Sequence, residues 1–155
     1  MKDHLLDIVQ HTHGLGVIDL VKVIGTEQDT TVSAIAEDRS VIVEAKFAGP
    51  VADFVGTFGM PNLDRLNTIL NLPVYDKDSK ISIQTKTEED GTVVPSSVHF
   101  ETKDGSFVND YRLMSKVLVE EKVKTITFKG TSWDVEFEPT IAGIMRLKKQ
   151  ASANA

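Results

Sequence analysis

The chain has 155 residues, of which 41% are hydrophobic, enough for one well-packed core or two small ones. It contains 17 basic and 23 acidic residues, so its formal net charge is −6, and attraction to nucleic acid would have to come from local basic clusters. The absence of cysteine excludes disulfides, thiolate zinc sites and cysteine nucleophiles. The N-terminus lacks the apolar core of a signal peptide, and no apolar run is long enough to span a membrane, so we expect a soluble, cytoplasmic protein.

The first half of the chain predicts two helices separated by strands. Residues 3–14 have the apolar spacing of an amphipathic helix that ends near Gly14. Residues 19–25, 30–36 and 40–47 are strand-like and are separated by turn-forming residues, which is typical of an antiparallel meander. An extended crossing should then lead through Pro61 into a short amphipathic helix over residues 62–72.

The second half predicts further strands and a final helix. Residues 80–86 and 92–103 read as strands, and Pro95 favours an edge position or a bulge in the second of them. Residues 104–122 lack a clean period and indicate a connector with a single helical turn. Residues 124–130 and 132–139 predict two more strands, followed by an amphipathic helix over residues 140–155. Together these elements predict an α+β fold in which antiparallel sheets back short amphipathic helices.

An extended segment, a proline and a short helix occur in the same order twice. The first copy passes through Pro61 and the second through Pro139, near the start of a helix, where the missing N–H of proline costs nothing. We therefore expect a first domain over residues 1–103, a connector over 104–122, and the beginning of an incomplete second domain over 123–155.

This order of elements resembles the sliding clamps of T-even-like bacteriophages, which are DNA polymerase processivity factors. The similarity is carried by HLLDIVQHTHGLG (residues 4–16), SVIVEAKF (40–47), GMPNLDRLNTILNLP (59–73) and WDVEFEPTIAGIMRLKKQAS (133–152). In that family each domain has two helices backed by β-sheet, and protomers close head to tail into a ring around duplex DNA. Family protomers have two complete domains, so the resemblance implies either a truncated clamp or a shorter relative with another assembly.

The resemblance also implies which side chains face DNA. The helices of a clamp line its hole and attract phosphate without reading bases, while the outside of the ring stays acidic. The alternative for each helix is an ordinary solvent-exposed polar face. The residues on the matching helices are Arg65, Arg146, Lys148, Lys149 and, less directly, Lys2.

The partners implied by the resemblance are duplex DNA, a DNA polymerase, a clamp loader and further copies of the chain. The groove that receives polymerase and loader tails would lie near the connector. Val117, Leu118 and Val119 could contribute to it, although burial in a strand explains them equally well. A different reading is a small structural or adaptor protein of a phage, without enzymatic activity or a DNA role.

Other chemistry has little support in the sequence. His4, Asp7 and His11 share one helix face and are metal-ligand types, but no second ligand cluster accompanies them, so we expect no metal and no cofactor. Trp133 alternates with Val135 and Phe137, which predicts a core tryptophan rather than a base-stacking platform. The sequence has no phosphate-binding GxxxxGK[ST] loop and no GxSxG motif, so we expect no enzymatic activity.

Overall fold

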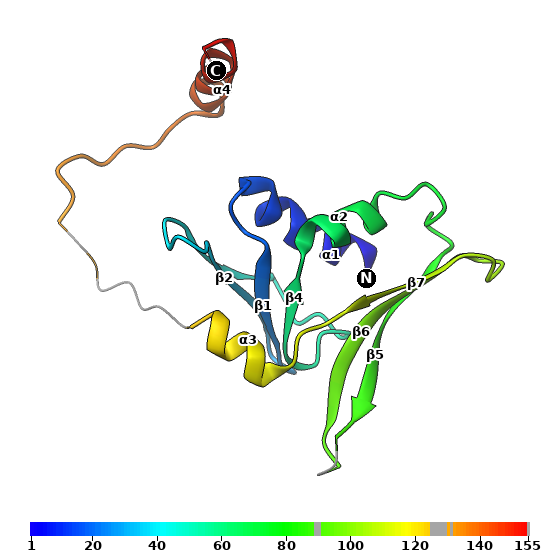
Figure 1. The fold of residues 1–155 in the computed structure, drawn as a ribbon. Coiled ribbons are helices and arrows are strands. Elements are labelled where there is room, and N and C mark those ends of the chain that lie inside the picture. Colours follow the sequence, from blue (N-terminus) through cyan, green and yellow to red (C-terminus); the bar gives the residue numbers. More distant parts are fainter. Residues whose placement is uncertain (89–90, 125–129, 131, 155) are drawn as a thin grey trace. The chain divides into compact units, whose positions relative to one another are not determined.

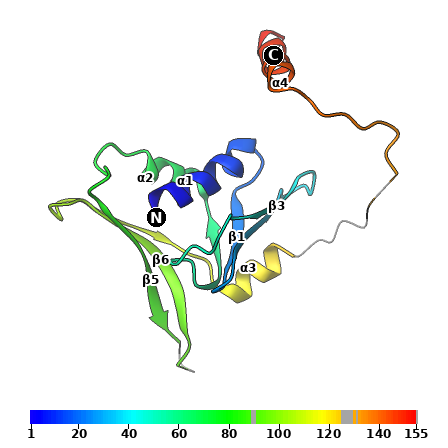
Figure 2. The same ribbon diagram turned by 180° about the vertical axis from the view of Figure 1, so that it is seen from behind.

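The computed structural model describes residues 1–88, 91–124, 130 and 132–154. The chain divides into two compact units, Met1–Thr125 and Ile126–Ala155, and each is described by itself. The first unit combines helices with two antiparallel sheets, which confirms the predicted α+β class (Figure 1 and Figure 2). Among the described helices, none is long and apolar enough to cross a membrane.

The first sheet has the strand order β3-β2-β1-β4 and is antiparallel throughout. The strands β1 (Leu20–Gly25), β2 (Thr30–Ile35) and β3 (Ile42–Lys46) form the predicted meander. The extended crossing predicted before Pro61 is instead a fourth strand, β4 (Gly56–Pro61), which pairs with β1 over its whole length. It is a strand because Phe58 and Met60 alternate into the core, a pattern that the intervening Gly59 hides in the sequence.

The second sheet has the order β5-β6-β7. Strands β5 (Lys80–Thr87) and β6 (Val93–Glu101) lie where strands were predicted, and their register shifts next to Pro95, as the bulge prediction required. Strand β7 (Val108–Arg112) pairs with β6 inside the segment predicted to be a connector. Only Tyr111 of β7 is a buried apolar residue, so no alternation marks this strand in the sequence.

An isolated backbone pair links β4 of the first sheet to the chain just beyond β7. Gly59 in β4 donates its N–H to the carbonyl of Met114 at 2.9 Å, and Met114 returns a hydrogen bond to the carbonyl of Gly59 at 2.8 Å. β4 therefore pairs with β1 on one edge and with the chain just beyond β7 on the other.

Two helices lie side by side on the core side of the sheets, as both views show (Figure 1 and Figure 2). Helix α1 (Lys2–His11) ends earlier than predicted and is followed by the 3₁₀ turn η1 (His13–Leu15) and a left-handed Gly16 at φ 79°. Helix α2 (Leu63–Leu70) lies within the predicted range. Their buried residues, which complete the core over the sheets, are Leu5, Ile8, Val9, Leu63, Leu66, Ile69 and Leu70.

Helix α3 (Lys116–Lys122) packs on the opposite face of the first sheet. Lys22 of β1 lies between the core residues Val21 and Val23, so its side chain leaves the sheet on the other face. There its ammonium donates a hydrogen bond of 3.0 Å to the carbonyl of Val123, the C-cap of α3. The single turn predicted in the connector is thus a longer helix that belongs to the first unit.

The second unit contains α4 (Ile141–Ala153), which confirms the predicted helix. The Thr140 hydroxyl caps it by accepting a hydrogen bond of 3.1 Å from the N–H of Gly143. The strand predicted over residues 132–139 is wrong, because Ser132–Pro139 has no strand structure and pairs with no described strand. Most of the strand predicted over residues 124–130 lies outside the described residues.

Candidate nucleic-acid and partner interfaces

The polar face of α2 presents Arg65 to solvent. The helix starts after Asn62, which has a left-handed φ of 56°, and the carboxylate of Asp19 accepts a hydrogen bond of 2.9 Å from the N–H of Leu63. The Arg65 guanidinium lies 3.5 Å from the backbone carbonyl of Asp110 in β7, the outer limit of a hydrogen bond. Arg65 is therefore exposed beside β7 and is available for an anion.

Lys2, the other candidate in the first unit, is held by the backbone. Its ammonium donates a hydrogen bond to the carbonyl of Tyr75, and the residue is half-buried. The exposed faces of α1 and α2 also carry the carboxylates of Asp3, Asp7 and Asp64. The paired-helix face is consequently mixed in charge, and it is less basic than the resemblance implies.

The three remaining DNA-facing candidates lie on α4 and are exposed. At about 100° per residue, Arg146 and Lys149 project from one side of this helix. Lys148 falls on the opposite side, which it shares with Ile141 and Ile144. None of the three basic residues makes an ion pair within the described part of the chain. Arg146 and Lys149 thus form the basic face of α4, and Lys148 is separate from them.

The three apolar residues predicted near a docking groove have different environments on α3. Val117 is 75% exposed and Leu118 is 51% exposed, whereas Val119 is fully buried. Burial in a strand is therefore the wrong explanation for this segment, which is helical. Val117 and Leu118 form a small exposed apolar patch, here called the apolar step on α3, that could receive a partner. Val119 packs α3 against the sheet.

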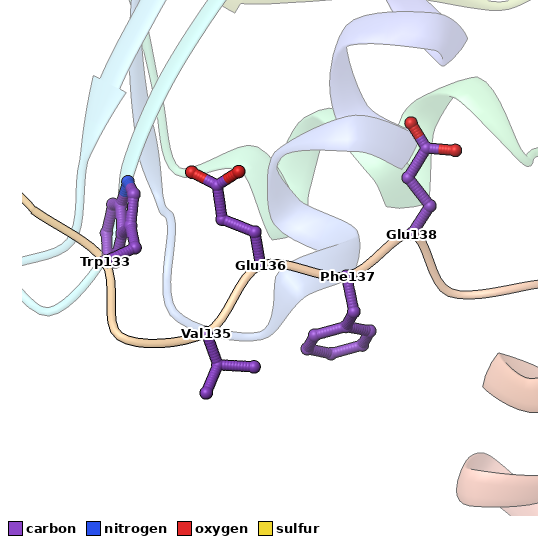
Figure 3. Close-up of a pocket in the computed structure, with 5 residues that line it drawn as sticks. All are labelled: Trp133, Val135, Glu136, Phe137 and Glu138. Atoms are coloured by element: carbon purple, nitrogen blue, oxygen red, sulfur yellow. The ribbon is translucent and has the colours of Figure 1, made fainter.

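The segment before α4 presents an exposed apolar strip. Trp133, Val135, Glu136, Phe137 and Glu138 line a pocket of about 610 Å³ (Figure 3). Figure 3 shows Val135 and Phe137 on one side of the chain and the two glutamates on the other. The prediction of a core tryptophan is wrong, because Trp133 is 61% exposed and Phe137 is 79% exposed. Without a pairing strand in the described structure, the alternation produces a two-sided exposed segment instead of a core strand.

A basic pocket at the junction of the two sheets was not predicted. This junction pocket has a volume of about 590 Å³ and contains three basic side chains, of which only Arg65 was a candidate. The residues come from segments far apart in the sequence and meet only through the sheet topology, so no local motif could reveal them. Its lining residues are Pro61, Asn62, Arg65, Lys86, Pro95, Ser96, Tyr111, Arg112, Leu113, Met114, Ser115 and Leu118.

The N-terminal histidines do not assemble a metal site. The Nδ1 atom of His4 is buried without a hydrogen-bond partner, and its ring makes edge contacts with Phe47 and Phe54 at centroid distances of 5.6 and 6.4 Å. His11 instead pairs with Asp7 at 3.1 Å on the exposed side of α1. Within the described residues there is no cluster of three His, Cys, Asp or Glu side chains that could hold a metal ion.

Comparison of the sequence with known protein families and with individually curated proteins found no match. The described surfaces offer an exposed arginine beside a paired-helix face, a basic face on α4, an apolar step on α3 and a basic pocket between the sheets.

Proposed function

We propose that this chain is a non-enzymatic, clamp-type processivity factor that encircles duplex DNA together with further copies and tethers a replicative polymerase. The observation that supports this function best is the placement of α1 and α2 side by side over two antiparallel sheets (Figure 1). A protein that holds a duplex without reading its sequence needs a surface that contacts phosphates and a rigid wall behind it. The proposal places the protein in the cytoplasm of a phage-infected bacterium.

An internal repeat within the first unit also supports the proposal. A helix followed by a three-stranded antiparallel meander occurs once as α1-β1-β2-β3 and again as α2-β5-β6-β7. This repeat differs from the strand-proline-helix repeat expected from the sequence, whose second copy lacks its strand. Two helices backed by sheet in one domain are what the resemblance to sliding clamps implies.

The proposed DNA contacts are Arg65 on α2 and the basic face of α4, Arg146 and Lys149. Lys148 and Lys2 contribute less, because one lies on the other side of α4 and the other is held by the carbonyl of Tyr75. A few phosphate contacts on an otherwise acidic chain suit a protein that must stay on DNA and still move along it.

The proposed partner contact is the apolar step on α3. Val117 and Leu118 are exposed on a helix that is fixed to the outside of the first sheet. A short apolar motif of a polymerase or clamp loader would bury these two side chains, and burial of apolar surface would supply the affinity.

The DNA contacts are tested by the salt dependence of duplex binding. We expect Arg146→Gln with Lys149→Gln to reduce the slope of log K against log salt by about 1.8, or about 0.9 for each lost phosphate contact. The matched control, Lys77→Gln with Lys103→Gln, makes the same charge change in the first unit and should keep the slope. An equal slope in all three proteins would remove the basic face of α4 from the DNA interface.

An adaptor without a DNA role is the second candidate, and the exposed strip from Trp133 to Phe137 favours it. In that case the chain would neither bind duplex DNA nor increase polymerase processivity. Substitution of Val135 and Phe137 by serine would then abolish association with a protein partner, whereas the variants of α4 would have no effect.

A further inference from the structure

The junction pocket combines positive charge, hydroxyl groups and apolar surface. It lies between the start of α2, the first residues of β6 and the end of β7, and its volume of about 590 Å³ is within the range of small-molecule sites. We propose that it binds a nucleotide unit, with the phosphate held by Arg65, Lys86 and Arg112. This site shares Arg65 with the proposed DNA contacts but uses no residue of the basic face of α4, and it does not require the chain to encircle DNA.

The charge of the pocket favours a phosphate. Its three basic side chains come from α2, β5 and β7, and no carboxylate is among the residues that line it. Arg65 and Arg112 make no ion pair with any described residue, and Lys86 lies 3.5 Å from Glu88 in an exposed pair. Two guanidinium groups match the oxygens of a phosphate in bidentate geometry, and an exposed lysine pair costs little to rearrange.

The rest of the lining suits the sugar and the base. Asn62, Ser96 and Ser115 supply polar groups, and the Ser96 hydroxyl already donates a hydrogen bond of 3.0 Å to the carbonyl of Gln84. Its oxygen can still accept a hydrogen bond. Pro61, Pro95 and Leu118 provide apolar surface on which a base can pack. A small inorganic anion would gain no binding energy from these apolar side chains, whereas a nucleotide base would.

The walls of the pocket are fixed by hydrogen bonds within the protein. The Tyr111 hydroxyl donates to the carbonyl of Pro61, and burial, together with the negative charge of Asp19, raises the pKa of this phenol. The N–H of Leu113 donates to the carbonyl of Ser96 at 2.9 Å. These bonds connect the end of β4, the end of β7 and β6, so the pocket is formed before a ligand arrives, which lowers the cost of binding.

The ligand could be a free nucleotide or a nucleotide within a strand, and two probes distinguish these sources. Deoxythymidine monophosphate represents the free nucleotide, and single-stranded oligodeoxythymidylate represents the strand. Each is titrated against the full chain by calorimetry, with amide chemical shifts of Arg112 to Ser115 as the local readout. Binding of the monophosphate alone identifies a free nucleotide, and preference for the oligonucleotide identifies a strand.

The decisive variant is Lys86→Gln with Arg112→Gln. Both residues are exposed, so the fold should be kept, and we expect binding of the preferred probe to weaken by at least about tenfold. Lys77→Gln with Lys103→Gln is the matched control and should bind normally. The inference would be overturned if neither probe binds, or if the control variant weakens probe binding as much as Lys86→Gln with Arg112→Gln does. Displacement of the bound probe by an acidic peptide without any nucleotide would also overturn it. The α4 variants should not change this binding, so failure of the clamp proposal would be recognised separately.

Discussion

Val119 of α3 packs directly against Gly59 of β4, and no side chain fits between them. A Cβ atom added to Gly59 would lie 2.8 Å from Cγ2 of Val119 and 3.0 Å from Cβ of Met114. Real Cβ atoms essentially never approach a neighbouring carbon so closely. This glycine is therefore the position at which β4 accommodates both α3 and the pairing with Met114.

Gly59→Ala should destabilise the first unit by about 1–3 kcal/mol, because the added methyl group overpacks the interface between β4 and α3. Urea unfolding followed by circular dichroism measures the change. Gly49→Ala is the control, since a Cβ at Gly49 meets nothing within 4 Å, and its effect should stay within about 0.5 kcal/mol. Equal stability of the two variants would show that α3 moves away without cost.

His4→Phe should stabilise the protein by about 1 kcal/mol. The substitution removes a buried Nδ1 atom that has no hydrogen-bond partner and keeps an aromatic ring against Phe47 and Phe54. Thermal unfolding is the measurement. His11→Phe on the exposed side of the same helix should give no gain, and a loss of stability in His4→Phe would indicate that the Nδ1 atom has a partner in solution.

Asp104 should make stability depend on pH in the acid range. Hydrogen bonds from the hydroxyls of Ser106 and Thr102 and from the N–H of Ser106 lower the pKa of its carboxyl from 3.8 to about 2. Because the folded pKa is the lower one, the stabilisation is complete above about pH 4 and is lost as the pH falls toward about 2. In Asp104→Asn this part of the loss should disappear from urea midpoints measured between those values. Ser106→Ala removes the hydroxyl that lowers the pKa of Asp104 most, so the pH range over which this stabilisation is lost should become narrower.

If the proposed clamp function holds, Val117→Ser with Leu118→Ser should weaken stimulation of a polymerase. The melting temperature should stay almost unchanged, since both side chains are exposed. Val119→Ala should do the reverse: a stability loss of about 1–2 kcal/mol from the cavity, with stimulation retained at low temperature. Processivity assays and thermal unfolding of both variants are the two measurements. A loss of stability in the double serine variant would instead show that Val117 and Leu118 contribute to the packing of the core.

The elements that could be predicted from the sequence are those in which the residues of the element itself show a clear local pattern. The leucines of α2 reveal which face of that helix is buried, and turn-forming residues mark the limits of the strand-like segments that become β1 and β2. The structure confirms both kinds of element. Strand β7 escaped prediction because its pairing with β6 depends on backbone hydrogen bonds and on the single core residue Tyr111. At Trp133 the error was the opposite one, a strand that was predicted but is not formed. Its cause is also the dependence on a partner, since alternating residues form a strand only where another strand is present to pair with them.

The candidate site divides in a similar way. Arg65 was found because it lies on the polar face of a recognisable helix, whereas Lys86 and Arg112 become neighbours of the same pocket only after two sheets are assembled. Helix periodicity could have separated Lys148 from Arg146 and Lys149 in advance. The buried position of Val119 depends on Gly59, far away in the sequence, and no local pattern contains that information.

The hydrogen-bonded pair of Gly59 and Met114 is a backbone bridge from β4 to the chain just beyond β7, and the described strands of the two sheets share no other backbone ladder. Opening these two bonds, of 2.9 and 2.8 Å, would break no bond inside either ladder, and the hydrogen bond from the Tyr111 hydroxyl to the carbonyl of Pro61 would still join β7 to β4. The amide protons of Gly59 and Met114 should therefore exchange with solvent through local opening, faster than those of the paired residues in the middle of β1. Their exchange rates would report how easily the first unit flexes along the line between its sheets.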